Sequence, residues 1–215
     1  MLALIIPVTA FQQNCSIIWD EKSRRAAIVD PGGDLEQILK AVDEQELALE
    51  KILLTHAHLD HAAATSELAA IRKIPVEGPH RDDKSWIDNL PEAVQRYGFR
   101  PARSFEPDRW LAHGDAVTVG AETLEVLHCP GHTPGHVVFF HRQQRFAWVG
   151  DVLFAGSIGR SDLPRGDHDI LVRSIRETLF PLGDDVRFLP GHGPMSTFGE
   201  ERRTNPYVRD ALFRK

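Results

Sequence analysis

The sequence predicts an α+β protein in which two β-sheets pack together between outer layers of helices, a four-layer α/β/β/α sandwich. Short strand-type runs recur in both halves of the 215 residues, and helical segments accompany them in a similar order in each half. A dense cluster of histidine and aspartate follows one of these runs, where layered folds of helices and strands gather their functional groups. Because no linker or low-complexity tract interrupts the chain, we expect one domain over residues 1–215.

Turn residues separate three strand-type runs at the start of the chain, over residues 2–7, 15–20 and 25–29. A helix is expected from 35 to 45, with Asp34 as its N-cap, because apolar side chains recur on one of its faces. A buried strand over 52–54, a helix over 63–72 and a short strand near Val76 complete the first half.

Residues 78–110 carry many Pro, Asp and Arg residues, so we expect short helices and loops there. The second half offers further strand-type runs near residues 116–119, 122–128, 136–141, 145–149 and 186–189. A helix around 168–179 precedes the last of these strands, and a helical piece from about residue 198 follows it. One sheet from each half, packed face to face, would form the sandwich.

The segment over residues 55–61 reads Thr-His-Ala-His-Leu-Asp-His. It places His56, His58, Asp60 and His61 next to one another between a buried strand and a helix. Buried histidines need a partner for each ring nitrogen, so four such groups together are costly unless a cation binds them. We therefore predict a metal site here and not a solvated loop.

Three further donors follow later strand-type runs, namely His132 in Pro-Gly-His-Thr-Pro-Gly-His, Asp151 in Val-Gly-Asp, and His192 in Pro-Gly-His-Gly-Pro. Imidazoles and carboxylates together suit Zn(II), Fe(II) and Mn(II), whereas an all-oxygen set suits Mg or Ca. The complete set exceeds the needs of one tetrahedral zinc. It indicates two metals that share a carboxylate and a water.

The order His-x-His-x-Asp-His, followed by a lone His, Asp and His after successive strands, resembles the metallo-β-lactamase-fold hydrolases over nearly the whole chain. The flanking segments are similar to the glyoxalase II branch, the hydroxyacylglutathione hydrolases, and above all to its short bacterial type II or YcbL-type members. These segments are residues 6–15, Ile-Pro-Val-Thr-Ala-Phe-Gln-Gln-Asn-Cys, and 159–167, Gly-Arg-Ser-Asp-Leu-Pro-Arg-Gly-Asp.

The resemblance implies two metal sites, one on His56, His58 and His132 and the other on Asp60, His61 and His192. It also implies that Asp151 bridges the two metals and that Asp60 and Asp151 are the catalytic carboxylates. Zn(II) is our first choice for both sites, with Fe or Mn as alternatives. Two such cations lower the pKa of a bridging water and supply hydroxide near pH 7, so no protein nucleophile is required.

By the same resemblance the protein is a binuclear thioester hydrolase that cleaves S-D-lactoylglutathione to glutathione and D-lactate, a step of methylglyoxal detoxification. Arg160 stands where the longer enzymes carry lysine, and its guanidinium is expected to bind a substrate carboxylate. Pro194 and Asp162 stand where those enzymes carry tyrosines. Only 23 residues follow His192, so we expect no separate C-terminal glutathione-binding domain and only partial recognition of glutathione.

Charge, apolar runs and cysteine content indicate which partners and which compartment to expect. A net charge of −6 and a pI near 6.0 argue against a chain built to bind nucleic acid, and no apolar run approaches the length of a membrane span. Residues 1–8 lack the basic segment and cleavage site of a signal peptide. The two cysteines, Cys15 and Cys129, indicate a reducing compartment. We expect a cytoplasmic monomer that acts on a small-molecule thioester.

Several residues have two interpretations. Asp30 can orient a ligand histidine or form an Asx-turn, and His136 can have a supporting or a catalytic role. Cys129 is expected to be a buried structural thiol. Arg160 can pair with a neighbouring aspartate, Asp162 or Asp167, instead of with substrate. The other histidines are expected to face solvent or nearby backbone, namely His80, His113, His128, His141 and His168.

The function also has alternatives on the same fold. A persulfide dioxygenase with one iron is the first of them, although such enzymes typically read Pro-Ala-His-Asp-Tyr where this chain reads Pro-Gly-His-Gly-Pro around His192. A β-lactamase is disfavoured because the common forms bind metal through a cysteine at the position of Asp151. A nuclease would usually carry an additional nucleic-acid-binding domain.

Overall fold

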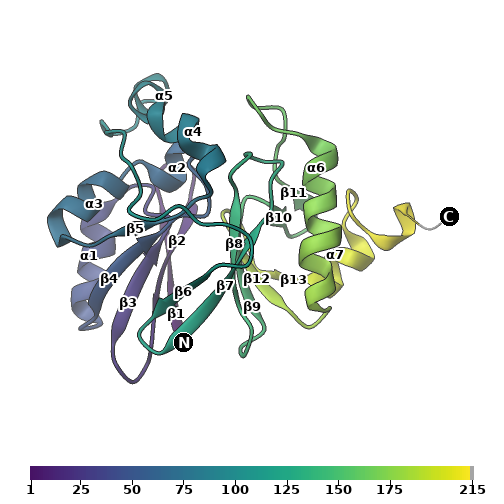
Figure 1. The fold of residues 1–215 in the computed structure, drawn as a ribbon, viewed down its shortest axis with the longest axis horizontal. Helices are drawn as coiled ribbons and strands as arrows, with labels where there is room; N and C mark the ends of the chain where they lie inside the picture. The colour runs from purple at the N-terminus through teal and green to yellow at the C-terminus, as the bar shows by residue number, and fades with distance from the viewer. Residues whose placement is uncertain (214–215) are drawn as a thin grey trace.

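The computed structural model describes residues 1–213 and has four layers, with two β-sheets lying between outer helices (Figure 1). The first sheet has the order β1-β2-β3-β4-β5, with bounds Leu2–Val8, Gln13–Trp19, Arg25–Val29, Ala48–Leu53 and Val76–Glu77. The second has the order β13-β12-β9-β8-β7-β6, with bounds Ser196–Thr197, Arg187–Pro190, Phe146–Gly150, Val137–His141, Glu122–His128 and Ala116–Val119. The predicted α+β sandwich is confirmed.

Helices cover the outer face of each sheet (Figure 1). Helices α1 (Leu35–Glu44) and α3 (Thr65–Arg72) pack on the first sheet. On the second sheet lie α6 (His168–Arg173), its π-helical continuation η2 (Ser174–Leu179), and α7 (Phe198–Thr204). The remaining short elements are α2 (Leu59–Ala62), η1 (Arg81–Asp83), α4 (Lys84–Asp88), α5 (Leu90–Tyr97), β10 (Leu153–Phe154), β11 (Ser157–Ile158), η3 (Phe180–Leu182) and η4 (Asp210–Leu212).

Alternation along the strands distributes apolar side chains among three interfaces, because successive side chains of a strand point to opposite faces. In β3, Ile28 packs toward the helices and Val29 toward the second sheet. In β9, Val149 packs toward α6 and Trp148 packs between the sheets. Three hydrophobic clusters result, one at each boundary between neighbouring layers.

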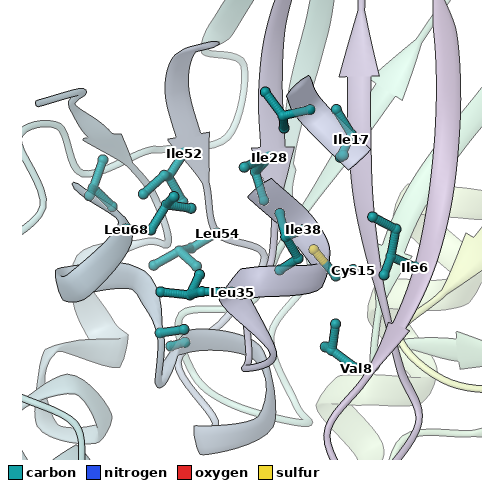
Figure 2. Packing of buried hydrophobic residues seen from close by; sticks show 14 of the residues in the cluster. Ile6, Val8, Cys15, Ile17, Ile28, Leu35, Ile38, Ile52, Leu54 and Leu68 are labelled. Carbon is teal, nitrogen blue, oxygen red and sulfur yellow. The ribbon is translucent and has the colours of Figure 1, made fainter. Parts of the chain in front are cut away.

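The cluster between the first sheet and its helices shows how α1 is held (Figure 2). Leu35, Ile38 and Val42 recur on one face of the helix and are buried against the strands. Full burial of a side chain such as Ile38 stabilises the fold by roughly 1.5–3 kcal/mol. Asp34 occupies the predicted N-cap position, but it has a left-handed conformation with φ 48°, and its carboxylate accepts from the backbone N–H of Thr9 and does not cap the helix.

Two other boundaries differ from the prediction. The helix expected from residue 63 is preceded by α2, so Asp60 and His61 already lie in a helical turn. The helix expected over 168–179 changes from α to π geometry at Ser174. Among the described residues, the structure contains no helix with the length and apolar character needed to cross a membrane.

Candidate metal centre

Four strand ends bring the predicted donors to one edge of the sandwich. β4 leads to His56 and His58, β7 leads to His132, β9 leads directly to Asp151, and β12 leads to His192. β7 and β9 both pair antiparallel with β8, and β12 pairs parallel with β9. These three strands therefore run in the same direction, and their C-terminal ends meet at the same edge.

The first group of donors consists of His56, His58 and His132, with one ring nitrogen of each within 4.8 Å of the others. His58 Nδ1 and His132 Nε2 face each other at 2.8 Å. All three residues are buried. The ring of Trp86 packs edge-on against His58, with centroids 4.5 Å apart, and helps to fix the orientation of that imidazole.

The second group consists of Asp60, His61 and His192, and its donor atoms also lie within 4.8 Å of one another. His192 Nε2 is 3.0 Å from Asp60 Oδ2. Adjacent positions of α2 supply Asp60 and His61, whereas His192 comes from the loop after β12.

Asp151 lies between the two groups. Its Oδ1 is 3.3 Å from His61 Nε2, and its Oδ2 is 3.6 Å from His132 Nε2 and 3.7 Å from His192 Nε2. One carboxylate thus reaches members of both groups, which is the position that a bridging ligand requires. The structure brings together all seven donors that the sequence singled out.

Hydrogen bonds at the opposite ring nitrogens orient the histidines, as is usual for metal-binding imidazoles. His61 donates from Nδ1 to Asp30 Oδ2 at 2.9 Å, and the Asp30 carboxylate also accepts from the backbone N–H and the hydroxyl of Thr55. His132 donates from Nδ1 to the carbonyl of Arg160 at 2.7 Å. Of the two interpretations of Asp30, the structure supports orientation of a histidine.

His192 and His56 are held in a similar way. His192 donates from Nδ1 to the carbonyl of Phe11 at 3.0 Å. The hydroxyl of Thr55 lies 3.1 Å from His56 Nδ1 and already donates to Asp30, so it accepts from the imidazole. Each ring therefore carries a proton on Nδ1, which leaves Nε2 as the nitrogen that could face a metal.

Glycines flank the centre where a side chain would collide with it. A Cβ on Gly32 would lie 1.5 Å from the carbonyl oxygen of Asp60, and one on Gly159 would lie 1.9 Å from the carbonyl oxygen of Asp151. A Cβ on Gly191 would lie 2.0 Å from Asp151 Oδ1. The glycines in these motifs are thus required by close approach of the loops.

Burial controls the charge of the first group. Desolvation lowers the pKa of His56 and His132 and lowers the pKa of His58 to about 3. These three imidazoles are therefore neutral at pH 7 and their lone pairs are available to a metal.

In the second group, the neighbouring carboxylates determine the charge of the histidines. Burial opposes protonation of His61 and His192, but the charges of Asp151 and Asp60 outweigh it and raise the pKa of both imidazoles. Burial alone would raise the pKa of Asp151, yet the neighbouring imidazoles hold it well below its usual range. The two carboxylates therefore favour positive charge beside them, which either protons on the imidazoles or divalent cations can supply.

Several buried polar atoms of the centre have no hydrogen-bond partner, and they indicate whether metals fit there. Nε2 of His56, Nε2 of His61 and Oδ1 of Asp151 are buried and have no hydrogen-bond partner among the described residues. A buried polar atom without a partner costs about 1–3 kcal/mol, and a cation bound to these atoms removes that cost. Imidazoles with two carboxylates fit borderline divalent ions such as Zn(II), Fe(II) and Mn(II). The residues present therefore fit divalent metals.

Asp83 is a supporting residue that the sequence did not reveal. Its buried carboxylate accepts from the backbone N–H of Ala57 at 3.0 Å, the hydroxyl of Thr133 at 2.9 Å and the backbone N–H of Gly135 at 2.6 Å. It therefore ties the loop of His56 and His58 to the loop of His132. The local sequence around Asp83 carries no signal for this contact, because both partner loops are distant along the chain.

Asn14 holds the loop of His192. Its side-chain amide donates to the carbonyls of Pro190 at 3.0 Å and Gly193 at 2.9 Å, and its backbone N–H donates to the carbonyl of Gly191 at 2.7 Å. The sequence pattern included Asn14 in a characteristic segment, but only the structure indicates what it contacts.

The remaining candidates have defined positions. The Arg160 guanidinium makes two hydrogen bonds of 2.8 Å to the Asp162 carboxylate and is largely exposed. His136 accepts at Nε2 from the backbone N–H of Asp151 at 3.0 Å and stacks on His56, which is a supporting role. Cys129 is buried, as expected of a structural thiol, and burial raises its pKa.

Comparison with known proteins agrees with this geometry. Residues 8–192 match the family model of the metallo-beta-lactamase superfamily. The chain is 46% identical to "Hydroxyacylglutathione hydrolase GloC" of Haemophilus influenzae, over 95% of this chain and 96% of that protein.

Two solved structures are also similar. One is titled "Crystal structure of BLEG-1 B3 metallo-beta-lactamase", with a TM-score of 0.88, 35% identity, and coverage of 96% of this chain and 99% of that one. The other is a di-iron-bound form of TTHA1623, with a TM-score of 0.87, 34% identity, and coverage of 95% and 100%. The chain therefore belongs to the metallo-beta-lactamase superfamily, and it is a metal-dependent hydrolase.

Proposed function

We propose that the protein hydrolyses a glutathione thioester, with S-D-lactoylglutathione as the expected substrate and glutathione and D-lactate as the products. The observation that carries this proposal is the meeting of two three-donor groups at one carboxylate, Asp151. The 46% identical relative named as a hydroxyacylglutathione hydrolase supports the choice of substrate.

In this proposal His56, His58 and His132 hold one metal, and Asp60, His61 and His192 hold the second. Bound there, two divalent cations would activate water and polarise the thioester carbonyl. Asp151 would contribute a carboxylate oxygen to each site, and the Asp30 carboxylate holds His61 in one orientation. The thioester suits this centre because its thiolate leaves readily and needs no strong acid from the protein.

Arg160 is the proposed contact for a glutathione carboxylate. Its carbonyl accepts from His132, so its side chain starts at the border of the metal centre, and it is 60% exposed. In the structure its guanidinium is paired with Asp162. A substrate carboxylate would have to compete with Asp162 for the same bidentate geometry, so binding is expected to be modest.

Two variants separate substrate binding from loop structure. Arg160→Ala should raise KM for S-D-lactoylglutathione and lower kcat/KM by the equivalent of about 1–3 kcal/mol, the usual contribution of a charged hydrogen bond. Asp162→Asn removes the competitor and should leave KM unchanged or lower it. Equal losses in both variants, or an equal loss with a small uncharged thioester, would show that Arg160 shapes the loop and does not bind substrate.

Metal content and activity test the assignment of the centre. Metal-replete protein should contain close to two metals per chain. Asp151→Ala should lose both together with activity, and His192→Ala should lose chiefly one. His168→Ala, at an exposed position, is the matched control and should behave as wild type. One metal per replete chain, with full activity in His192→Ala, would overturn the two-metal assignment.

Parallel assays decide the reaction class. Hydrolysis of S-D-lactoylglutathione should proceed without oxygen, whereas oxygen uptake with glutathione persulfide at a higher rate would indicate a dioxygenase.

The 35% identity to BLEG-1 B3 metallo-beta-lactamase makes hydrolysis of a β-lactam the second candidate function. A cephalosporin cleaved with a higher kcat/KM than S-D-lactoylglutathione would favour it.

A further inference from the structure

A second cluster of ligand-type side chains lies outside the metal centre. It consists of His80 and Asp82, at the start of η1, and His128, the last residue of β7. One donor atom from each lies within 4.8 Å of the others. The two imidazoles stack with centroids 4.2 Å apart and an interplanar angle of 22°. His128 lies 46 positions after Asp82, so the sequence does not predict its approach to the other two residues.

The hydrogen bonds of His128 resemble those of a metal-binding histidine. Its Nε2 donates to the carbonyl of Pro134 at 2.8 Å, so its proton is on Nε2 and Nδ1 carries a free lone pair. Partial burial lowers the pKa of His128, so the ring is neutral at pH 7. A carbonyl that fixes the far nitrogen is the arrangement that orients histidines at metal sites.

His80 and Asp82 provide a second, independent observation. The backbone N–H of Asp82 donates to His80 Nδ1 at 3.2 Å, so this nitrogen carries a lone pair. The Asp82 carboxylate oxygen Oδ2 lies only 3.4 Å from the same nitrogen. Both atoms are acceptors that face the same point, and a cation there would attract both, replacing the long 3.2 Å N–H bond as the partner of the nitrogen lone pair.

Backbone contacts connect this cluster to the metal centre. The backbone N–H of His80 donates to the carbonyl of Gly135 at 3.0 Å, and the N–H of Asp83 donates to the carbonyl of His80 at 3.0 Å. Pro134 and Gly135 belong to the same loop as His132. An ion bound at the cluster would therefore stiffen both this loop and the segment that carries Asp83.

We propose that His80, Asp82 and His128 bind a third divalent transition-metal ion, such as Zn(II), which braces the loop that carries His132. Two imidazoles and one carboxylate are a donor set for Zn(II), with water completing the coordination. We assign the site a structural role, because its backbone contacts lead to the loop that carries His132. Its affinity should be weaker than that of the buried centre, since the side chains of His80 and Asp82 are 26% and 52% exposed.

Zinc binding at controlled free concentrations tests the proposal with the metal itself as the probe. Replete wild-type protein, dialysed against a series of zinc buffers, should bind one more equivalent than its tightly held complement. Asp82→Asn and His128→Gln should each weaken this last equivalent by about tenfold or more, as removal of a ligand or its partners does at other sites. Asp88→Asn and His168→Gln are matched controls at exposed positions and should bind as wild type does.

Thermal unfolding supplies a second readout. Raising free zinc through the range of the weak site should raise the Tm of wild type and of both controls, but not the Tm of Asp82→Asn. The Asp82 side chain is exposed and its substitution keeps the backbone N–H bond, so this variant should fold normally. The proposal would be overturned if wild type bound no extra equivalent of zinc. It would also be overturned if both cluster variants bound that equivalent with unchanged affinity. Because only the difference between wild type and variants counts, the result does not depend on the metal number or activity of the main centre.

Discussion

Replacement of Gly191 by alanine should damage the metal centre through a single steric contact. The added Cβ would lie 2.0 Å from Asp151 Oδ1 and 2.6 Å from His61 Cε1. Ordinary contact begins near 3.4 Å, so the Asp151 oxygen would have to move by the difference, 3.4 − 2.0 = 1.4 Å. Metal–ligand distances tolerate only about ±0.2 Å, and a misplacement of about 1 Å at a reacting centre can cost on the order of 100-fold in rate.

Gly193→Ala is the matched control for this prediction. Gly193 flanks His192 on its other side, and a Cβ there would meet no heavy atom within 4 Å. Its φ of +75° is strained for alanine, so the control should lose about 1–2 kcal/mol of stability but keep its metals. Metal content after dialysis, kcat/KM for the thioester and the circular dichroism spectrum should be measured for both variants. Full metal content and activity within about threefold of wild type in Gly191→Ala would refute the steric reasoning.

Three further predictions follow from named contacts. Burial raises the pKa of Asp83 from 3.8 to about 6, so its proton is held more tightly in the folded state; the stability it contributes is complete below pH 3.8 and decreases as pH rises through 6. The shift corresponds to about 3 kcal/mol, so the free energy of unfolding of wild type, measured in urea, should fall by about that amount relative to Asp83→Asn between pH 3 and 7, and a pH-independent difference would contradict this. Asn14→Asp would place a carboxylate oxygen against the carbonyls of Pro190 and Gly193, and should loosen the His192 loop and lower occupancy of one metal site; unchanged metal titration curves would count against it. Removal of the metals by a chelator should lower the free energy of unfolding by about 4 kcal/mol if they are present at about 1,000 times their Kd, whereas an unchanged Tm would mean that the site is stable without them.

The metal donors could be identified from the sequence because their signal is local. His56, His58, Asp60 and His61 stand within six positions, and the other donors each follow a strand-type run directly. A strand of alternating apolar residues must bury one face. The residues that face the core, and the position at which the strand ends, can therefore be predicted from the strand's own sequence. The four-layer arrangement was predictable for the same reason, whereas the order of strands within each sheet comes from the structure.

The interactions around the donors could not be read in this way. Asp30, which follows β3, contacts His61, which follows the neighbouring strand β4, and Asp83 joins two loops that come from different sheets. The carboxylate of Asp34 looked like a helix cap but bonds to the hairpin at Thr9. Each of these polar groups has several potential partners of equal chemical quality, and only the packing of the layers selects one.

The sequence by itself determined the fold class, the seven candidate metal donors and the family, because hydrophobic alternation and dense ligand spacing are properties of short segments. Tertiary structure decided which hydrogen bonds hold the donors, that Arg160 pairs with Asp162, and that His80 and His128 stack. These features depend on distances between residues that lie far apart in the chain or on the free choice of an exposed side chain. Such distances are set by the burial of three apolar interfaces at once, and no single segment carries that information.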